Sequence, residues 1–310
     1  MINQKVFLAG HNGLVGSSIL KKLKEKGYKN IITRNKKQLN LLEFKKVLNF
    51  LKKTKPHYII VAAAKVGGIY SNYKYQAEFI YQNLSIQSNI IHSAYLAGVK
   101  NLIFLGSSCV YPKFSKQPIK EDYLLSGKLE ETNDAYAIAK IAGIKMCEAY
   151  NNQYGVNYIC LMPTNLFGPN DNYDLKTSHF FPALIKKIYK AKKNKLKFVK
   201  LWGNGKAKRE LMYVDDLADA CEFFLRKKTR HSLINIGSGK EMSISGYCKY
   251  LMKKLKFDGK IIYDHKMPNG TPRKVLNCDL AKKYGWKAKI KLDEGLRLTL
   301  EDLKKNKKIL

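Results

Sequence analysis

The sequence predicts an α/β fold built around a doubly wound parallel sheet, and three observations support this prediction. Short apolar runs alternate with longer amphipathic segments throughout the first half of the chain. The short runs are apolar along their whole length, which is typical of strands that helices cover on both faces. A glycine-rich turn separates the first apolar run from the first amphipathic segment. With right-handed crossovers, such a chain forms a Rossmann-type sheet that binds a nucleotide at the carboxyl ends of its strands.

The order of the elements follows from the length and period of the apolar runs. Runs of about four apolar residues predict strands at 6–9, 30–33, 58–61, 102–105 and 158–161. The amphipathic segments that follow the first four of these runs predict helices at 14–26, 42–53, 77–98 and 135–154.

Beyond residue 163 the pattern is less regular. It predicts strands at 198–201 and 234–236 and helices at 181–192, 214–225 and 243–255, the last beginning at the cap residue Ser243. We therefore expect a nucleotide-binding domain over residues 1–163 and a smaller mixed α/β lobe over residues 164–310. Some segments of the second part are expected to return to the main sheet.

Composition excludes several classes of protein. No stretch approaches the roughly 20 apolar residues of a membrane span, and the N-terminus does not resemble a signal peptide. We therefore expect a cytoplasmic protein without a membrane partner. The six cysteines lack the spacing of a metal site, so no metal is expected. The net charge of +34 comes mostly from lysines spread along the chain, without a nucleic-acid-binding motif. Nucleic acid is thus not an expected partner, although a positive field suits an anionic cofactor and substrate.

A glycine-rich turn predicts a dinucleotide site near the N-terminus. Gly10, Gly13 and Gly16 form a GxxGxxG pattern directly after the first predicted strand. Glycines permit a tight turn and let backbone N–H groups, here also those of Leu14 and Val15, approach a pyrophosphate at a helix N-terminus. Such a loop alone could be a structural turn, but its place between a strand and a helix favours cofactor binding.

The end of the second predicted strand favours NADPH/NADP over NAD. NAD-binding proteins usually carry an acidic residue there for the ribose hydroxyls, whereas this chain has none between residues 33 and 37. Arg34 and Lys36 could instead pair with a 2′-phosphate. The general lysine excess is a competing explanation, and it applies more to Lys37 than to Arg34.

A tyrosine, a lysine and a serine predict a reductase centre. Tyr136 and Lys140 are four residues apart on a predicted helix, so their side chains share one face. We expect the lysine ammonium to lower the pKa of the phenol, which then protonates a carbonyl oxygen as hydride arrives. Ser107 follows the fourth predicted strand and is expected to polarise the same carbonyl. The YxxxK spacing is frequent by chance, but its position after that strand favours the functional interpretation.

Several longer segments resemble a known family. They are residues 62–68 (AAAKVGG), 106–113 (GSSCVYPK), 136–145 (YAIAKIAGIK), 162–168 (MPTNLFG), 214–217 (VDDL) and 270–274 (GTPRK). Together they resemble the GDP-L-fucose synthase family of the extended short-chain dehydrogenase/reductase superfamily, over about residues 5–300. The resemblance implies NADPH-dependent reduction of the C4 ketone of a GDP-4-keto-6-deoxy sugar, coupled to epimerisation at C3 and C5.

The resemblance also implies roles for individual residues. Reduction would fall to Ser107, Tyr136 and Lys140, and epimerisation to Cys109 and His179, whose side chains titrate near neutrality. Taken alone, Cys109 could be a small buried residue and His179 a helix-start residue. The expected cofactor contacts in the matching segments are Ala63, Lys140 and Pro163, and the expected GDP-sugar contacts are Asn165, Lys187, Trp202, Arg209 and Lys274.

Two positions depart from the family pattern, which has arginine where this chain has Asn12 and Lys187. The first change removes one expected contact to the NADP phosphate, and the second alters one expected contact to the substrate. The family also suggests a homodimer formed through the helices predicted at 77–98 and 135–154.

Two other functions remain open at this stage. The chain could be a C4-reductase only, acting on a related GDP-4-keto-6-deoxy hexose or heptose that another enzyme epimerises. Alternatively, it could be a non-catalytic NADP-binding sensor, although the intact Ser107, Tyr136 and Lys140 set argues against this. Proton exchange at C3 and C5 without NADPH distinguishes the first alternative, and a Tyr136→Phe variant distinguishes the second.

Overall fold

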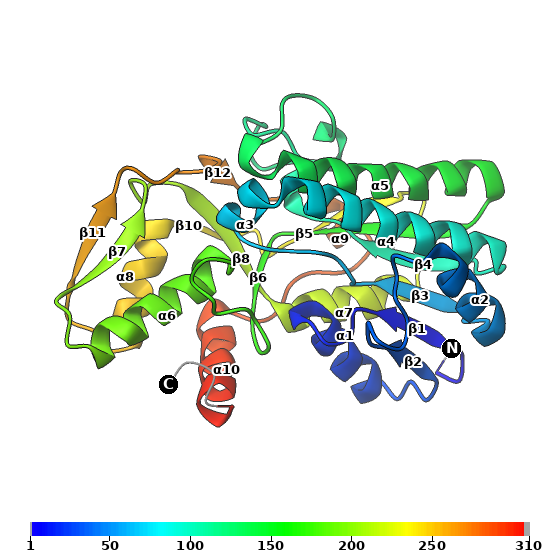
Figure 1. The fold of residues 1–310 in the computed structure, drawn as a ribbon, viewed down its shortest axis with the longest axis horizontal. Helices are drawn as coiled ribbons and strands as arrows, with labels where there is room; N and C mark the ends of the chain where they lie inside the picture. Colours follow the sequence, from blue (N-terminus) through cyan, green and yellow to red (C-terminus); the bar gives the residue numbers. More distant parts are fainter. Residues whose placement is uncertain (1, 307–310) are drawn as a thin grey trace.

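The computed structural model describes residues 2–306 and confirms the predicted α/β fold (Figure 1). Its centre is a six-stranded sheet in the order β2-β1-β3-β4-β5-β9, in which every pairing is parallel. The strands are β1 (Val6–Ala9), β2 (Ile31–Arg34), β3 (Tyr58–Val61), β4 (Asn101–Leu105), β5 (Asn157–Pro163) and β9 (Leu233–Ile236).

Helices cover both faces of this sheet. On one face lie α2 (Phe44–Thr54), α4 (Gln76–Leu96) and α5 (Asp134–Tyr154), and on the other α1 (Leu14–Glu25) packs against α7 (Val214–Leu225) (Figure 1). Successive strand side chains point to opposite faces. Phe7 and Ile59 accordingly belong to one buried cluster, whereas Leu8 and Ile60 belong to another. Burial on both faces explains why these strands are apolar along their whole length.

The strand order creates a crevice at the carboxyl edge of the sheet. From β1 the chain moves to β2 on one side, and β3 then pairs with β1 on the other side. Neighbouring strands whose connections leave in opposite directions form a switch point, where ligands of open α/β sheets bind. Gly10 follows β1 and Ala62 follows β3, so both loops border this crevice.

A smaller lobe lies at the end of the molecule opposite α2 (Figure 1). Its sheet contains β6 (Asn165–Phe167), β8 (Lys208–Tyr213), β10 (Glu241–Ser243) and β12 (Arg273–Lys274), and a separate parallel pair joins β7 (Phe198–Trp202) to β11 (Lys260–Asp264). Its helices are α6 (Phe180–Lys193), α8 (Ile244–Lys254) and α10 (Leu292–Lys305). These elements share their own apolar core, which includes Phe181, Leu201 and Leu251.

Two segments beyond residue 163 belong to the main sheet layer. Helix α7 packs against α1, and strand β9 pairs with β5 at the sheet edge. Trp286, which follows α9 (Asp279–Lys283), is buried in the same apolar cluster as Ile234 of β9. The chain therefore leaves the lobe for the main layer, returns to the lobe and comes back once more, before α10 returns it to the lobe.

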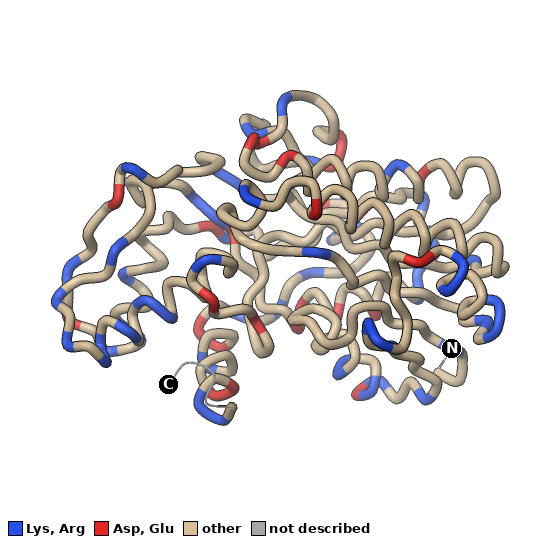
Figure 2. The backbone as a smooth tube through the Cα atoms, in the orientation of Figure 1, with Lys and Arg blue, Asp and Glu red and all other residues tan. Residues whose placement is uncertain are grey.

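Basic residues are distributed over both parts of the molecule (Figure 2). No helix among residues 2–306 is long and apolar enough to cross a membrane. Within the same residues, no cluster of three or more histidine, cysteine or acidic side chains is arranged to hold a metal ion.

Candidate active site

The glycine turn packs so closely that only glycine fits at two of its positions. Gly10 has a φ of 89°, and a Cβ there would lie 2.5 Å from the backbone nitrogen of Ala63. A Cβ on Gly16 would collide with the carbonyl oxygen of Gly10. The N-cap residue of α1, Gly13, supplies no capping side chain, so the first-turn N–H groups are available to an anion. Leu14 and Val15 begin this helix, and the arrangement fits the pyrophosphate of a dinucleotide.

Two cations lie on the same sheet edge. Arg34 ends β2 and is exposed, and its guanidinium donates to the carbonyl of Thr33 at 2.7 Å and lies 5.5 Å from the ring centroid of Phe50. Lys36 is exposed in the turn that Asn35 closes. The 2′-phosphate of NADP is the part of the cofactor that such cations suit.

Lys140 is buried beside the carboxyl end of β4. It is 3% exposed, its ammonium donates to the carbonyl of Leu105 at 2.8 Å, and it lies 4.7 Å from the ring centroid of Phe104. Burial lowers the pKa of Lys140 to about 8. The proton of this ammonium is therefore much more easily lost than that of a lysine in water.

Tyr136 differs from the expectation in one respect. Its ring centroid lies 5.9 Å from the Lys140 ammonium, so the helix spacing does bring the two side chains together. However, the pKa of Tyr136 is raised by burial and by the nearby Cys109 thiol, and a hydrogen bond with Ser107 opposes this only in part. The prediction that Lys140 lowers the pKa of Tyr136 was wrong, because the lysine ammonium binds the Leu105 carbonyl while the phenol is desolvated.

Cys109 lies where the main layer meets the small lobe, and we call the region around it the cleft. It belongs to the short helix η1 (Ser108–Val110), and its backbone N–H donates to Ser107 Oγ at 3.3 Å. The Lys274 ammonium lies 3.4 Å from its sulfur. Burial alone would raise the pKa of Cys109, but the Lys274 ammonium, the Ser107 hydroxyl and the Arg209 guanidinium outweigh it, so the pKa is lowered.

His179 approaches the same place from the small lobe. It is the N-cap residue of α6. Its pKa is lowered by desolvation and by the Lys274 ammonium. Lys274 thus influences both residues that the resemblance implicates in epimerisation.

The loop that carries His179 is held by residues that the sequence did not single out. The N–H of Gly68 donates to the carbonyl of Thr177 at 2.8 Å, and a Cβ on Gly68 would collide with the carbonyl of Ser178. Asn83, which is buried in α4, makes two 3.0 Å hydrogen bonds to the backbone of Lys65. A polar residue on the apolar face of helix 77–98 was the sequence signal for this clamp.

The remaining predicted residues fall into two places. Pro163 ends β5, and Asn165 lies just beyond it in β6 and donates to the carbonyl of Glu210 at 3.1 Å. Lys187 is farther along α6, where its ammonium donates to the carbonyl of Lys200 at 2.9 Å and lies 5.5 Å from the ring centroid of Trp202. Lys187 and Trp202 therefore form a pair of their own, apart from the Cys109 contacts.

Sequence reasoning also missed Glu210, a carboxyl group with 0% exposure beneath the cleft. It accepts hydrogen bonds from the N–H groups of Gly239 at 2.7 Å and Leu276 at 2.8 Å. These bonds tie β8, and hence Arg209, to two connecting segments. Glu210 lies in a short strand without alternating polarity, so the sequence did not predict that its carboxylate would bind the two connecting segments.

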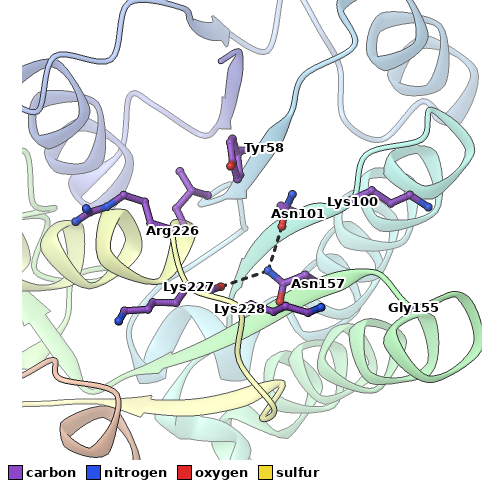
Figure 3. Close-up of a pocket in the computed structure, with 9 residues that line it drawn as sticks. Tyr58, Lys100, Asn101, Gly155, Asn157, Arg226, Lys227 and Lys228 are labelled. Atoms are coloured by element: carbon purple, nitrogen blue, oxygen red, sulfur yellow. Dashed lines mark hydrogen bonds between the residues drawn. The ribbon is translucent and has the colours of Figure 1, made fainter. Parts of the chain in front are cut away.

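A basic hollow at the other edge of the main sheet is a poorer candidate site. It encloses about 270 Å³ at the amino ends of β3, β4 and β5 (Figure 3). Its lining includes Tyr58, Asn101, Asn157, Lys100, Lys227 and Lys228. In Figure 3 the side chains of Lys100 and Lys227 point away from one another, so they do not converge on one ligand position.

Comparisons with known proteins agree with this geometry. Residues 6–237 match the model of the NAD dependent epimerase/dehydratase family. GDP-L-fucose synthase 1 of Arabidopsis thaliana is 49% identical over 302 residues, covering 97% of this chain and 94% of the relative. A GDP-6-OMe-4-keto-L-xylo-heptose reductase from C. jejuni superposes with a TM-score of 0.92 at 32% identity, covering 99% of each chain. A GDP-mannoheptose C4 reductase from Campylobacter jejuni, solved with NADP bound, superposes with a TM-score of 0.88 at 33% identity, covering 98% of this chain and 99% of that one.

The matched residues include the glycine turn, η1 and the Tyr136–Lys140 helix, so the similarity covers most of the cleft. The chain therefore belongs to the NAD dependent epimerase/dehydratase family and, within it, to the group of the GDP-L-fucose synthases.

Proposed function

We propose that the protein is an NADPH-dependent enzyme that reduces the C4 ketone of a GDP-4-keto-6-deoxy sugar and also epimerises its C3 and C5 centres. The observation that carries this proposal is a connected set of hydrogen bonds and electrostatic interactions across the cleft. Ser107 interacts with both Tyr136 and Cys109, and Lys274 acts on both Cys109 and His179. A reducing set and an epimerising pair thus share one substrate position.

In the reduction, NADPH held at the glycine turn and beside Lys140 would supply the hydride for C4 of the sugar. Tyr136 gives its phenolic proton to the ketone oxygen, so the carbonyl becomes a hydroxyl. The Ser107 hydroxyl donates a hydrogen bond to the same oxygen as negative charge develops there. Lys140, with its pKa near 8, holds a mobile proton next to the phenol.

In the epimerisation, the C4 ketone acidifies the protons on C3 and C5. Cys109 as a thiolate takes a proton from carbon, and the electron pair moves into the enolate oxygen, which Ser107 stabilises. His179 acts in its protonated form, which the lowered pKa makes a stronger acid, and gives a proton to carbon from the small-lobe side. The imidazole then takes up a proton from solvent as the Cys109 thiol releases one, which restores both groups. The two groups come from different parts of the chain, η1 and the start of α6, which suits transfer on opposite faces of the ring.

NADPH is the cofactor that the site favours. Arg34 and Lys36 are cationic and the turn from residue 33 to 37 has no carboxylate. The related C. jejuni C4 reductase binds NADP. A reducing compartment suits the chain, because all six cysteines are free, and we propose the cytoplasm.

The deciding experiment combines the pure protein with GDP-4-keto-6-deoxy-D-mannose and NADPH. Loss of NADPH absorbance with GDP-L-fucose as the product, identified by NMR, supports the proposal. Tyr136→Phe is the matched control, because it removes one hydroxyl and should abolish NADPH oxidation. If this variant oxidises NADPH as fast as the wild type, the proposed proton donor is wrong.

The second candidate is a C4-reductase that does not epimerise, which the two C. jejuni reductases favour. Incubation in D2O without NADPH separates the candidates. Deuterium at C3 and C5 that disappears in Cys109→Ser supports epimerisation. If the wild type shows no exchange but reduces a sugar already epimerised, the protein is a reductase only.

We also propose a homodimer formed through the outer face of α4 and α5. Tyr81, Leu96 and Ile138 on these helices are exposed by 64%, 42% and 46%. Light scattering should give twice the chain mass of 35.5 kDa, and Ile138→Lys should shift the protein toward monomer. A monomeric wild type at the same concentration contradicts this assembly.

A further inference from the structure

Lys274 is a buried lysine whose ammonium contacts sulfur. It is 9% exposed, and its nitrogen lies 3.4 Å from Cys109 Sγ. None of the ion pairs found among residues 2–306 includes Lys274. Burying an ammonium is costly unless an anion accompanies it. The thiol of Cys109, which contacts the Lys274 ammonium, can become that anion by losing its proton.

The backbone fixes this contact from both sides. Strand β12 pairs with β8 so that Lys274 lies opposite Arg209. The next residue, Val275, accepts from the N–H of Ile119 at 2.8 Å and donates to the side chain of Gln117 at 3.0 Å. Residues 117–119 belong to the loop that follows η1, the short helix that contains Cys109. The segment that carries Lys274 is therefore held by β8 on one side and by the loop after η1 on the other.

The other groups around Cys109 determine how strong the effect is. The titratable and charged groups that face it are Tyr136 from α5, Arg209 from β8 and Lys274 from β12, with the Ser107 hydroxyl at the start of η1. Burial raises the pKa of Cys109, and Lys274 is the largest influence that lowers it, ahead of Ser107 and Arg209. The tyrosine is neutral at pH 7, so the two cations dominate the charge near the sulfur.

We propose that Lys274 is a positioning residue that holds Cys109 as a thiolate, ready to accept a proton from the sugar. This rests on the epimerase half of the proposed function. The thiolate takes the proton from C3 or C5, becomes a thiol, and leaves the electron pair on the enolate. Lys274 thus acts through the sulfur even before substrate binds, which an anchor for the substrate diphosphate alone would not do.

The test measures thiolate formation without any substrate. The other five cysteines are buried, so iodoacetamide applied to the native protein should modify Cys109 first, and mass spectrometry with Cys109→Ser as the blank verifies the site. Only the thiolate reacts. The alkylation rate of the wild type should reach half its maximum below about pH 8.5, the ordinary value for a thiol. In Lys274→Gln this midpoint should rise by about one unit or more, which lowers the rate at pH 7 by about tenfold.

Two further variants separate the ammonium from other effects. Lys274→Arg keeps the cation and should keep most of the low midpoint. Lys208→Gln removes an exposed lysine from the residue that precedes Arg209 in β8, and it should leave the midpoint unchanged. Circular dichroism and NADP binding check that each variant is folded.

The proposal is overturned if folded Lys274→Gln has the wild-type midpoint, or if the wild-type midpoint itself is at or above the ordinary thiol value. The second criterion needs no variant and holds even if Lys274→Gln does not fold. A shifted midpoint in a protein that turns over no 4-keto sugar would refute the proposed function and leave the lysine–thiolate pair intact. With turnover present, deuterium exchange at saturating substrate should slow in Lys274→Gln and move to higher pH.

Discussion

The buried ammonium of Lys140 predicts that stability depends on pH in a way that one substitution removes. Its pKa falls from 10.5 to about 8, and the side chain is 3% exposed, so little solvent screening applies. At 1.36 kcal/mol for each pKa unit, this shift corresponds to about 3 kcal/mol. Below pH 8 Lys140 is protonated in both the folded and the unfolded chain. The folded state is then destabilised by the full free-energy cost of burying the ammonium. Between pH 8 and 10.5 the unfolded chain binds more protons, so the free energy of unfolding rises with pH.

Lys140→Met is the variant that tests this reasoning. It also breaks the hydrogen bond to the Leu105 carbonyl, which changes the free energy of unfolding at every pH by a similar amount. The pH-dependent part should remain visible: the wild type should gain about 3 kcal/mol relative to the variant between pH 7 and pH 10.5. Urea unfolding followed by circular dichroism and by tryptophan fluorescence measures both proteins, and coincident curves verify a two-state transition.

The matched control removes an exposed lysine from the same helix. Lys145 pairs with Glu148 at 2.7 Å on the surface of α5, so Lys145→Met changes the charge without uncovering a buried site. Parallel stability curves for the wild type and Lys140→Met from pH 7 to pH 10.5 would refute the argument. The same variant should lose NADPH oxidation, because the mobile proton beside Tyr136 is gone.

Three other substitutions test the cofactor site and the cleft floor. Gly16→Ala places a Cβ against the Gly10 carbonyl and should weaken NADP binding at least about tenfold by calorimetry, and an unchanged Kd would contradict the packing. Arg34→Ala should weaken NADPH by about tenfold while affecting NADH little, because only NADPH carries the 2′-phosphate, and an equal loss for both would exclude this contact. Glu210→Leu leaves two buried N–H groups, those of Gly239 and Leu276, without acceptors. It should destabilise the protein by about 3 kcal/mol, measured as a lower melting temperature. A melting temperature equal to that of the wild type would show that these two hydrogen bonds contribute little.

The elements that the sequence predicted well are those with a strong local or two-sided signal. The predicted bounds of β3 and α7 match the structure, and the Ser243 hydroxyl caps α8 by accepting from Gly246. Strand β3 is buried on both faces and therefore contains only apolar or aromatic residues. In such segments every position must be apolar, so the amino-acid composition alone identifies the strand.

The small lobe gave weaker signals because its strands are short and mixed in polarity. Strand β8 begins with Lys208, Arg209 and Glu210, which no alternating pattern identifies, and β12 has only two residues. Their pairing depends on partners more than 60 residues apart in sequence. Helix α10, with four acidic side chains, was also not predicted.

The candidate site divides in the same way. Helical spacing was enough to place Tyr136 next to Lys140, since both lie on one turn of α5. Spacing does not reveal burial, so the direction of the Tyr136 pKa was wrong. The contact between Cys109 and Lys274 joins residues 165 positions apart and exists only because β12 pairs with β8.

The chain crosses between the main sheet and the small lobe five times, near residues 164, 213, 237, 275 and 290. The lobe is therefore assembled from three separate segments, residues 165–213, 238–275 and 291–305, with α7 and β9 before the second and α9 before the third. An engineer who wants to exchange the small lobes of two such proteins has to transplant all three segments together. A single cut after residue 163 would remove an edge strand and a covering helix from the nucleotide-binding layer and expose its core.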